Sequence, residues 1–390
     1  MIKQVIPLVS SDMKTKHRII ILVLVGISFI FSLLHITRPR KKNSIDRTYV
    51  YGRYSNPWNN TIKGIEFLFD QRTLDLLRQL VIEMENGVKV RAVTPDVFNR
   101  HIKPVTAISS NHFEECMAHL HRVSLFFPNV DIIVYDLGMK PAEVRRMQYL
   151  PFVEYRRLNF SRYPSFVADL HLYAWKALVI QGVLAEFGSA LWFDASIVFN
   201  HDYGKILDHV VAKNSSFLFY IRKANHNILS ATQPQTFKYL PMKTINHLTN
   251  SMPQSGGMLI FNTEIVRRDI MQWALACSLL QDCIAPIGST INGCGDKYPV
   301  LAFSGCHRFD QSVFAITVAN AYDSEVERYS LPDSLLSFAH PWRVRHDWNW
   351  TGKTFIVIFI ISGIVVIVFV AFFICCHSKF YNRSYHTAIS

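Results

Sequence analysis

The sequence predicts an α/β domain with a parallel sheet, placed between two membrane-spanning helices. Strand-like and helix-like segments alternate over residues 105–198, which is the pattern of βαβ units. The continuous apolar run 190–193 is typical of a strand covered on both faces, and Asp194 ends it. Two long apolar segments, 19–36 and 354–376, flank the region and contain no Asp, Glu, Lys or Arg.

The elements follow from apolar periodicity and from the residues that begin and end them. Residues 61–100 carry a helical pattern, Asn111 can cap the next helix, and Gly188 suits the left-handed residue just past a helix end. The expected strands are 105–109, 130–135, 153–158, 190–198, 217–221 and 257–262. The expected helices are 113–127, 169–187, 264–280 and 310–319, together with a short helix that begins at Pro141. This order favours a Rossmann-like sheet with helices on both faces. No GxGxxG or Walker motif is present, which weakens dinucleotide-binding and P-loop functions.

The two apolar segments define the predicted topology. Segment 354–376 makes roughly 35 Å of helix, which is enough to cross the hydrocarbon core. Segment 19–36 is either a cleaved signal peptide or an anchor, and no small-x-small cleavage site follows it before the basic run 38–42, so we interpret it as a signal anchor. The expected organisation is a cytosolic tail (1–18), the anchor (19–36), a stalk and helical lead-in (37–100), a lumenal domain (101–345), a second transmembrane helix (354–376) and a cytosolic tail (377–390).

Basic residues flank segment 19–36 on both sides, so charge does not decide the orientation, but sequons and cysteine usage point to a lumenal compartment. Four N-x-S/T sequons, at Asn59, Asn159, Asn214 and Asn349, lie between the apolar segments. Four late cysteines, Cys277, Cys283, Cys294 and Cys306, allow three pairings and predict at least one disulfide, while Cys116 makes the count in this region odd. We therefore expect an integral membrane protein of the Golgi or endoplasmic reticulum, in contact with the lipid bilayer, with its main domain in the lumen.

The net charge of +12 favours anionic ligands such as nucleotides or acidic glycans. Nucleic acid is not an expected partner, because no basic run lies inside the domain and the predicted compartment is wrong for it.

Four groups of residues could carry chemistry. They are Ser109 with Asn111 after the first strand, Lys176 in the long helix, Asp194 with Ser196 after the fourth strand, and a late group of Gly256, Gly257, His307, Asp310 and His340. Ser109 and Asn111 could meet a nucleotide or serve as ordinary helix caps. Lys176 could extend its ammonium outward or reach a phosphate.

Asp194 could hold a metal with its attached phosphates, or cap a turn. The paired glycines allow close approach of the backbone to a ligand. His307, Asp310 and His340 are candidate ligands or acid/base groups, and each could equally be structural.

Three stretches resemble a known family. Residues 172–199 (LYAWKALVIQGVLAEFGSALWFDASIVF), 255–263 (SGGMLIFNT) and 306–316 (CHRFDQSVFAI) resemble membrane-bound nucleotide-sugar glycosyltransferases of the GT-A fold. More closely, they resemble an uncharacterised, invertebrate-expanded family of glycosyltransferase-like membrane proteins. The resemblance covers roughly residues 100–345 and implies a GT-A-like mixed sheet.

The resemblance also implies a reaction and roles for individual residues. A sugar would pass from a nucleoside-diphosphate sugar to a glycan or protein acceptor. Asp194 matches the first Asp of the D-x-D motif that holds Mn or Mg, and Ser196 stands where the second would be. The implied roles are Asp194, Ser196 and His340 at the metal, Ser109, Asn111, Lys176, Gly256 and Gly257 around the donor and acceptor, and Asp310 with His307 as acid/base groups. The alternative is a catalytically degenerate fold that binds glycans or a partner.

We predict that Asn159 or Asn214 carries an N-glycan, because both lie between the apolar segments in polar surroundings. Glycosidase treatment of the expressed protein should then increase its gel mobility. A glycan found only at Asn382 would mean that the chain has the opposite orientation in the membrane.

Overall fold

The computed structural model describes residues 68–195, 197, 203–221, 226–240, 249–294 and 303–331. All of them belong to one compact unit, Thr48–Ser390; a second unit, Met1–Arg47, lies outside the described residues. Both predicted membrane segments, 19–36 and 354–376, and both predicted tails also lie outside them. Within the described ranges, no helix has the length and apolarity needed to cross a bilayer.

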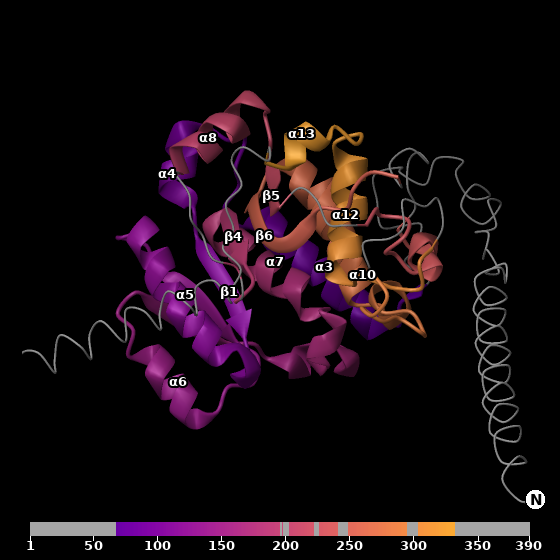
Figure 1. Ribbon diagram of the computed structural model, residues 1–390, viewed down its shortest axis with the longest axis horizontal. Coiled ribbons are helices and arrows are strands. Elements are labelled where there is room, and N and C mark those ends of the chain that lie inside the picture. Colours follow the sequence, from indigo (N-terminus) through magenta and orange to yellow (C-terminus); the bar gives the residue numbers. More distant parts are fainter. Residues whose placement is uncertain are drawn as a thin grey trace, which may run out of the picture. The chain divides into compact units, whose positions relative to one another are not determined.

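Six strands of the described residues form one mixed sheet (Figure 1). In spatial order they are β3 (Val153–Arg157), β2 (Ile132–Asp136), β1 (Pro104–Ile108), β4 (Ser189–Phe193), β6 (Gln254–Phe261) and β5 (Phe217–Ile221). The β3–β2, β2–β1 and β1–β4 pairs are parallel, whereas β6 is antiparallel to both β4 and β5. The predicted α/β class is confirmed: the strands predicted within 105–198 are parallel to one another, and β6 makes the whole sheet mixed.

Helices cover both faces of the sheet, as the alternation of side chains along β4 demonstrates. Leu191 and Phe193 belong to a core cluster that also contains Val123 of α5 (Phe113–Phe126) and Ile206 of α8 (Tyr203–Ala212). Trp192 points to the other face, where its ring lies 6.0 Å from that of Trp175, the first residue of α7 (Trp175–Phe187). Successive strand residues point to opposite faces, so a continuous apolar strand requires this double cover.

The remaining helices complete these two layers. The α-helices are α3 (Gln71–Asn86), α4 (Pro95–His101), α6 (Pro141–Gln148), α10 (Gln272–Ser278), α11 (Gln281–Ile284), α12 (Asp310–Ala321) and α13 (Val326–Tyr329). Short 3₁₀ turns occupy Ser110–His112, Phe160–Arg162, Ser165–Ala168, Leu170–Leu172 and Pro234–Lys238, and Val266–Met271 forms a π-helical turn. Helix α3 packs on α7, where the Gln181 amide donates to the Leu80 carbonyl oxygen over 3.0 Å.

Two predicted helices differ from the structure in how they begin. The predicted helix 169–187 is interrupted, because Tyr173 adopts a left-handed conformation with φ 54°, and α7 begins only at Trp175. Asn111 does not cap α5: it lies in the turn before that helix, and the N-cap is His112 without a side-chain bond. The expected helix 264–280 is present over 264–278, and its stretch Val266–Met271 is π-helical.

Two predicted strands end at different residues. The strand expected at 190–198 ends at Phe193, and the chain turns after Asp194, whose carbonyl oxygen accepts from the Ile197 amide over 2.9 Å. The strand expected at 257–262 begins earlier, at Gln254. Gly256 and Gly257 therefore both lie inside β6.

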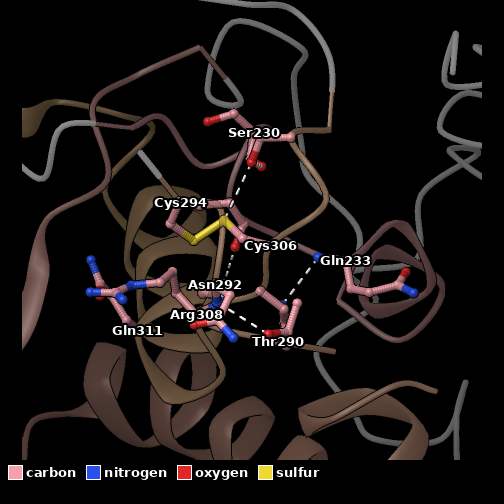
Figure 2. Close-up of a disulfide and its surroundings, with 12 residues drawn as sticks. Ser230, Gln233, Thr290, Asn292, Cys294, Cys306, Arg308 and Gln311 are labelled. Carbon is pink, nitrogen blue, oxygen red and sulfur yellow. Dashed lines mark hydrogen bonds between the residues drawn. A yellow bond between two sulfur atoms is a disulfide. The ribbon is translucent and has the colours of Figure 1, made fainter. Parts of the chain in front are cut away.

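Two disulfides are present, which confirms the prediction for the late cysteines. Cys277 at the end of α10 pairs with Cys283 in α11, and Cys294 pairs with Cys306 (Figure 2). Cys116 is buried and free, and burial raises the pKa of its thiol.

Gly188 should tolerate no side chain, for two separate reasons. Its φ is +79°, and an added Cβ would lie 2.8 Å from Val88 Cγ1. Gly288 has a similar φ of +84° with open space around it, so it is the matched control. We expect Gly288→Ala to cost roughly 1 kcal/mol from backbone strain alone, and Gly188→Ala roughly 2–4 kcal/mol. Thermal unfolding of the two variants measures the difference, and equal losses would show that the clash with Val88 adds nothing to the backbone strain.

Candidate functional site

Four elements meet at the edge of the sheet where β4 ends. Asp194 directly follows β4, Ser255 and Gly256 lie at the start of β6, Lys176 is the second residue of α7, and Asp310 is the first of α12. Because β6 is antiparallel to β4, its first residues arrive at the edge where β4 stops. Residues far apart in the sequence are thus brought together by the sheet register.

Lys176, Asp194 and Asp310 form a charged cluster, which we call the lysine–carboxylate cluster. The Lys176 ammonium lies 3.1 Å from Asp194 Oδ1 and 2.7 Å from Asp310 Oδ2. The side chains of Lys176 and Asp310 are 3% and 8% exposed, whereas that of Asp194 is 38% exposed. Asp194 is therefore the member of the cluster that a ligand can reach.

Two neutral donors hold the carboxylates in place. Trp192 Nε1 donates to Asp194 Oδ1 over 2.9 Å, and the Ser255 hydroxyl donates to Asp310 Oδ2 over 2.7 Å. Each of these carboxylate oxygens thus receives one neutral hydrogen bond in addition to the ammonium. Such charge-assisted bonds are stronger than neutral ones, and they fix the orientation of both carboxylates.

Gly256 allows the close approach of β6 to the cluster. A Cβ on this residue would lie 3.3 Å from Asp194 Oδ2 and 3.1 Å from Ile197 Cδ1. Gly257 meets Tyr220 on its side of the strand, where a Cβ would lie 3.1 Å from the Tyr220 Cβ. The predicted glycine pair thus divides into one residue that borders Asp194 and one that packs on β5.

Strained backbone flanks the cluster on both sides. Tyr173 has φ 54° and ψ 13°, and Phe309 has φ 45° and ψ −119°, although neither is a glycine. Their rings lie 5.7 Å apart, and Phe309 directly precedes Asp310. Such conformations cost about 1–3 kcal/mol each and persist where the surrounding structure enforces them, often at functional sites.

The electrostatics of Lys176 result from two opposed effects. Burial lowers its pKa, but the carboxylates of Asp194 and Asp310 outweigh burial and raise the pKa well above the usual lysine value. The helix dipole does not help, because Lys176 lies in the first turn of α7, where a positive charge is disfavoured. The two carboxylates therefore stabilise the ammonium in this position. Burial, followed by the charge of Asp310, raises the pKa of Tyr173.

The other predicted site residues lie elsewhere or outside the description. Ser109 donates to Asn111 Oδ1 over 2.6 Å at the end of β1. In the described part of the chain, neither residue forms a hydrogen bond with Lys176, Asp194 or Asp310. Ser196 and His340 lie outside the described residues.

His307 is buried, and both of its ring nitrogens are bonded to backbone. Nδ1 accepts from the Gln233 amide over 3.1 Å, and Nε2 lies 3.0 Å from the Ile284 carbonyl oxygen. Burial lowers its pKa to about 4, partly offset by the bond to Ile284. These contacts assign His307 to positioning the chain before Asp310, so we leave it out of the reacting groups.

Sequence reasoning assigned no role to Ser255, Trp192 or Gln311. The Gln311 amide donates to the Pro253 carbonyl oxygen over 3.0 Å and so ties α12 to the residue before β6. Its Oε1 accepts from Arg308 Nε over 3.2 Å, and Figure 2 shows both side chains beside the disulfide. Trp192 precedes Asp194 by two positions, so period-2 alternation could have placed both on one face.

The described residues do not fit a divalent metal. Of the predicted ligands Asp194, Ser196 and His340, only Asp194 is described, and the Lys176 ammonium already contacts it. Among the described ranges, no group of three His, Cys, Asp or Glu side chains could hold a metal ion.

Comparison with known proteins gives matches of two kinds. A family model described as a protein of unknown function (DUF1647) matches residues 41–181. No curated protein matches the chain.

Several solved glycosyltransferase structures are similar. The galactosyltransferase LgtC, solved with donor and acceptor sugar analogues, matches at 14% identity and a TM-score of 0.28, over 41% of this chain and 57% of its own. The S. cerevisiae mannosyltransferase Ktr4p, solved with GDP, matches at 7% identity and a TM-score of 0.29, over 53% of this chain and 70% of its own. Mouse xyloside xylosyltransferase 1 matches at 9% identity and a TM-score of 0.33, over 60% of this chain and 85% of its own.

These matches confirm the predicted likeness to GT-A glycosyltransferases, while the further likeness to an invertebrate-expanded family stays a prediction. Because all three TM-scores are below 0.5, we base the proposed function on the chain's own sheet order and charged side chains.

The two carboxylates of the cluster should differ in their effect on stability. We expect Asp310→Asn to cost about 3–5 kcal/mol, because it removes one partner of a buried ion pair. Asp194→Asn should cost about 1 kcal/mol or less, since that side chain is 38% exposed and Lys176 keeps its contact with Asp310. Chemical unfolding of both variants measures the two values. A larger loss for Asp194→Asn would show that the burial pattern of the cluster is wrong.

Proposed function

We propose that this protein is a membrane-bound glycosyltransferase of the GT-A type. It would move a sugar from a nucleoside-diphosphate sugar to a glycan or glycoprotein acceptor. The observation that carries the proposal is the pair of carboxylates, bridged by Lys176, at the edge of the sheet where β4 ends.

The sheet order supports a ligand site at this edge. The chain adds β2 and then β3 on one side of β1, and afterwards places β4 on the other side. This reversal is a topological switch point, and open α/β sheets bind ligands in the crevice outside the carboxyl ends of their strands at such points. Ser109 follows β1 and Asp194 follows β4, so the polar residues that end these two strands flank the switch point.

The charge of the cluster suits glycosyl transfer. Two carboxylates and one ammonium give a formal charge of −1, and the transition state of glycosyl transfer develops positive charge at the anomeric carbon. The bond from that carbon to the diphosphate oxygen would break, and a bond to the acceptor hydroxyl would form. We assign the acceptor proton to Asp194, the exposed carboxylate. Asp310, predicted to be the acid/base group, is instead assigned to holding Lys176.

The manganese or magnesium ion expected from the family resemblance has a minor place in this proposal. Asp194 is the one described residue among its predicted ligands. A solved relative, the mannosyltransferase PcManGT from Pyrobaculum calidifontis, binds GDP-Man and Mn²⁺. We route no step of the reaction through a metal in this chain.

The proposed setting is the lumen of the Golgi or endoplasmic reticulum, with residues 19–36 and 354–376 in the bilayer. Two observations support it. Disulfides such as Cys277–Cys283 persist in oxidising compartments. The sequon residues Asn159 and Asn214 are both exposed, as a glycan acceptor requires.

A second candidate function is a non-catalytic glycan- or partner-binding membrane protein. It is favoured by the ion pairs that both carboxylates form with Lys176. A carboxylate that is paired with an ammonium is less available to react with a substrate.

Donor turnover by the purified full-length protein tests the proposal. Release of nucleoside diphosphate is measured over a panel of nucleoside-diphosphate sugars, with and without Mn²⁺. We expect turnover of at least one donor, and a loss of about 10²-fold or more in Asp194→Asn. Asp75→Asn is the matched control, because Asp75 is 61% exposed on α3 and pairs only with Arg78 and Gln71 in the described part of the chain.

Three outcomes separate the two candidates. Turnover that Asp194→Asn abolishes and Asp75→Asn preserves supports the enzyme. Glycan or nucleotide binding without turnover supports the binding protein. Turnover that is unchanged in Asp194→Asn contradicts the assignment of this site.

A further inference from the structure

We propose that Lys176 is the resident cation of this site, and that it occupies the position between Asp194 and Asp310 where these two carboxylates would otherwise hold a divalent metal. This inference deepens the proposed function, on which its statement about the donor rests. The reaction of this protein would then be independent of divalent metal.

The geometry around the ammonium is that of a bound cation. Lys176 Nζ lies within hydrogen-bond distance of one oxygen from each carboxylate, at 3.1 and 2.7 Å. The ring of Trp192 lies 5.4 Å from the ammonium and that of Tyr173 lies 5.9 Å from it. Aromatic faces attract cations at such distances, so charged and neutral groups both stabilise the ammonium.

The position of Lys176 is fixed by the helix that carries it. Its neighbours Trp175, Ala177 and Leu178 are all buried, and α7 packs against α3. A metal could enter only if the ammonium moved away, yet the lysine side chain is 3% exposed and enclosed by its neighbours. Lysine is a flexible residue on a surface, but here packing removes that freedom.

Charge also opposes a second cation. A divalent ion between the carboxylates would lie within a few ångströms of the ammonium, in a site that solvent screens poorly. The lysine thus excludes a metal both by volume and by repulsion. Lys176 contacts Oδ1 of Asp194, so the other oxygen, Oδ2, stays available next to Gly256. A carboxylate oxygen accepts hydrogen bonds, so a sugar hydroxyl is the group we infer to bind there.

Removing the lysine should create the metal site that it excludes. Mn²⁺ binding to the full-length protein is measured by electron paramagnetic resonance, and Mn²⁺-dependent thermal unfolding is measured in parallel. We expect wild type and Asp194→Asn to bind Mn²⁺ equally, with no site that depends on Asp194. In Lys176→Gln, two carboxylates face one vacated position, so Mn²⁺ should bind roughly tenfold tighter or more and raise the melting temperature by about 5 °C or more.

Two variants serve as controls. The double variant Lys176→Gln, Asp194→Asn should lose the gained Mn²⁺ binding, because one of its carboxylates is gone. Lys103→Gln is the matched control: Lys103 is 12% exposed and lies 3.3 Å from Glu154 Oε2, so its removal leaves a single carboxylate, which Arg156 still contacts. That variant should gain no Mn²⁺ site, because a single carboxylate already paired with an arginine cannot hold the ion.

The outcomes distinguish this inference from the proposed function. Mn²⁺ binding by wild type that Asp194→Asn abolishes overturns the inference, even if Lys176→Gln fails to fold. Donor turnover that requires Mn²⁺ and stops in chelator also overturns it, while the proposed function stands. Turnover that persists in chelator supports both. Absence of turnover in every condition contradicts the proposed function alone. The comparison of Mn²⁺ binding by wild type and by Asp194→Asn still tests whether Lys176 excludes the metal.

Discussion

The buried ammonium of Lys176 is the constraint on which the rest of the site depends. A charge with 3% exposure is costly unless it is paired, and this one lies in the first turn of a helix, where the dipole opposes it. Asp194 and Asp310 must therefore stay where they are. Their own positions are set by the end of β4 and the start of α12, so one ion cluster couples the sheet to the helical layer.

The reversed strand β6 makes this coupling compact. A parallel strand would bring its last residues and a following loop to the same edge, whereas β6 brings its first residues there, within the sheet ladder. Ser255 then meets Asp310, and Gly256 borders Asp194, without an intervening loop. Groups carried on strands are held more precisely than groups carried on loops, which suits a site built from close charges.

Much of the fold could be predicted from the sequence, because its signals are local. Apolar runs and turn residues placed the first five strands within a few residues, and the apolar run before Asp194 placed that carboxylate at a strand end. The insertion of β6 between β4 and β5 is a long-range pairing, and no local pattern encodes it. The break before α7 depends on a left-handed Tyr173, a residue type that rarely signals such a conformation. Because ion pairing across the sheet edge is also long-range, the sequence showed Lys176 as a candidate without naming its partners.

The disulfide Cys294–Cys306 has a consequence for how this protein can vary. It joins two residues 12 positions apart, and the second of them lies four residues before Asp310. Directly after Cys306, the His307 amide donates to the Thr290 carbonyl oxygen and the Arg308 amide donates to that of Ala231, so backbone hydrogen bonds hold the chain that leads into α12. The disulfide holds the two ends of the segment between the cysteines together, whatever insertion or substitution lies within that segment. A change in the length of this segment therefore leaves the chain that leads into α12, and with it the charged cluster, in place.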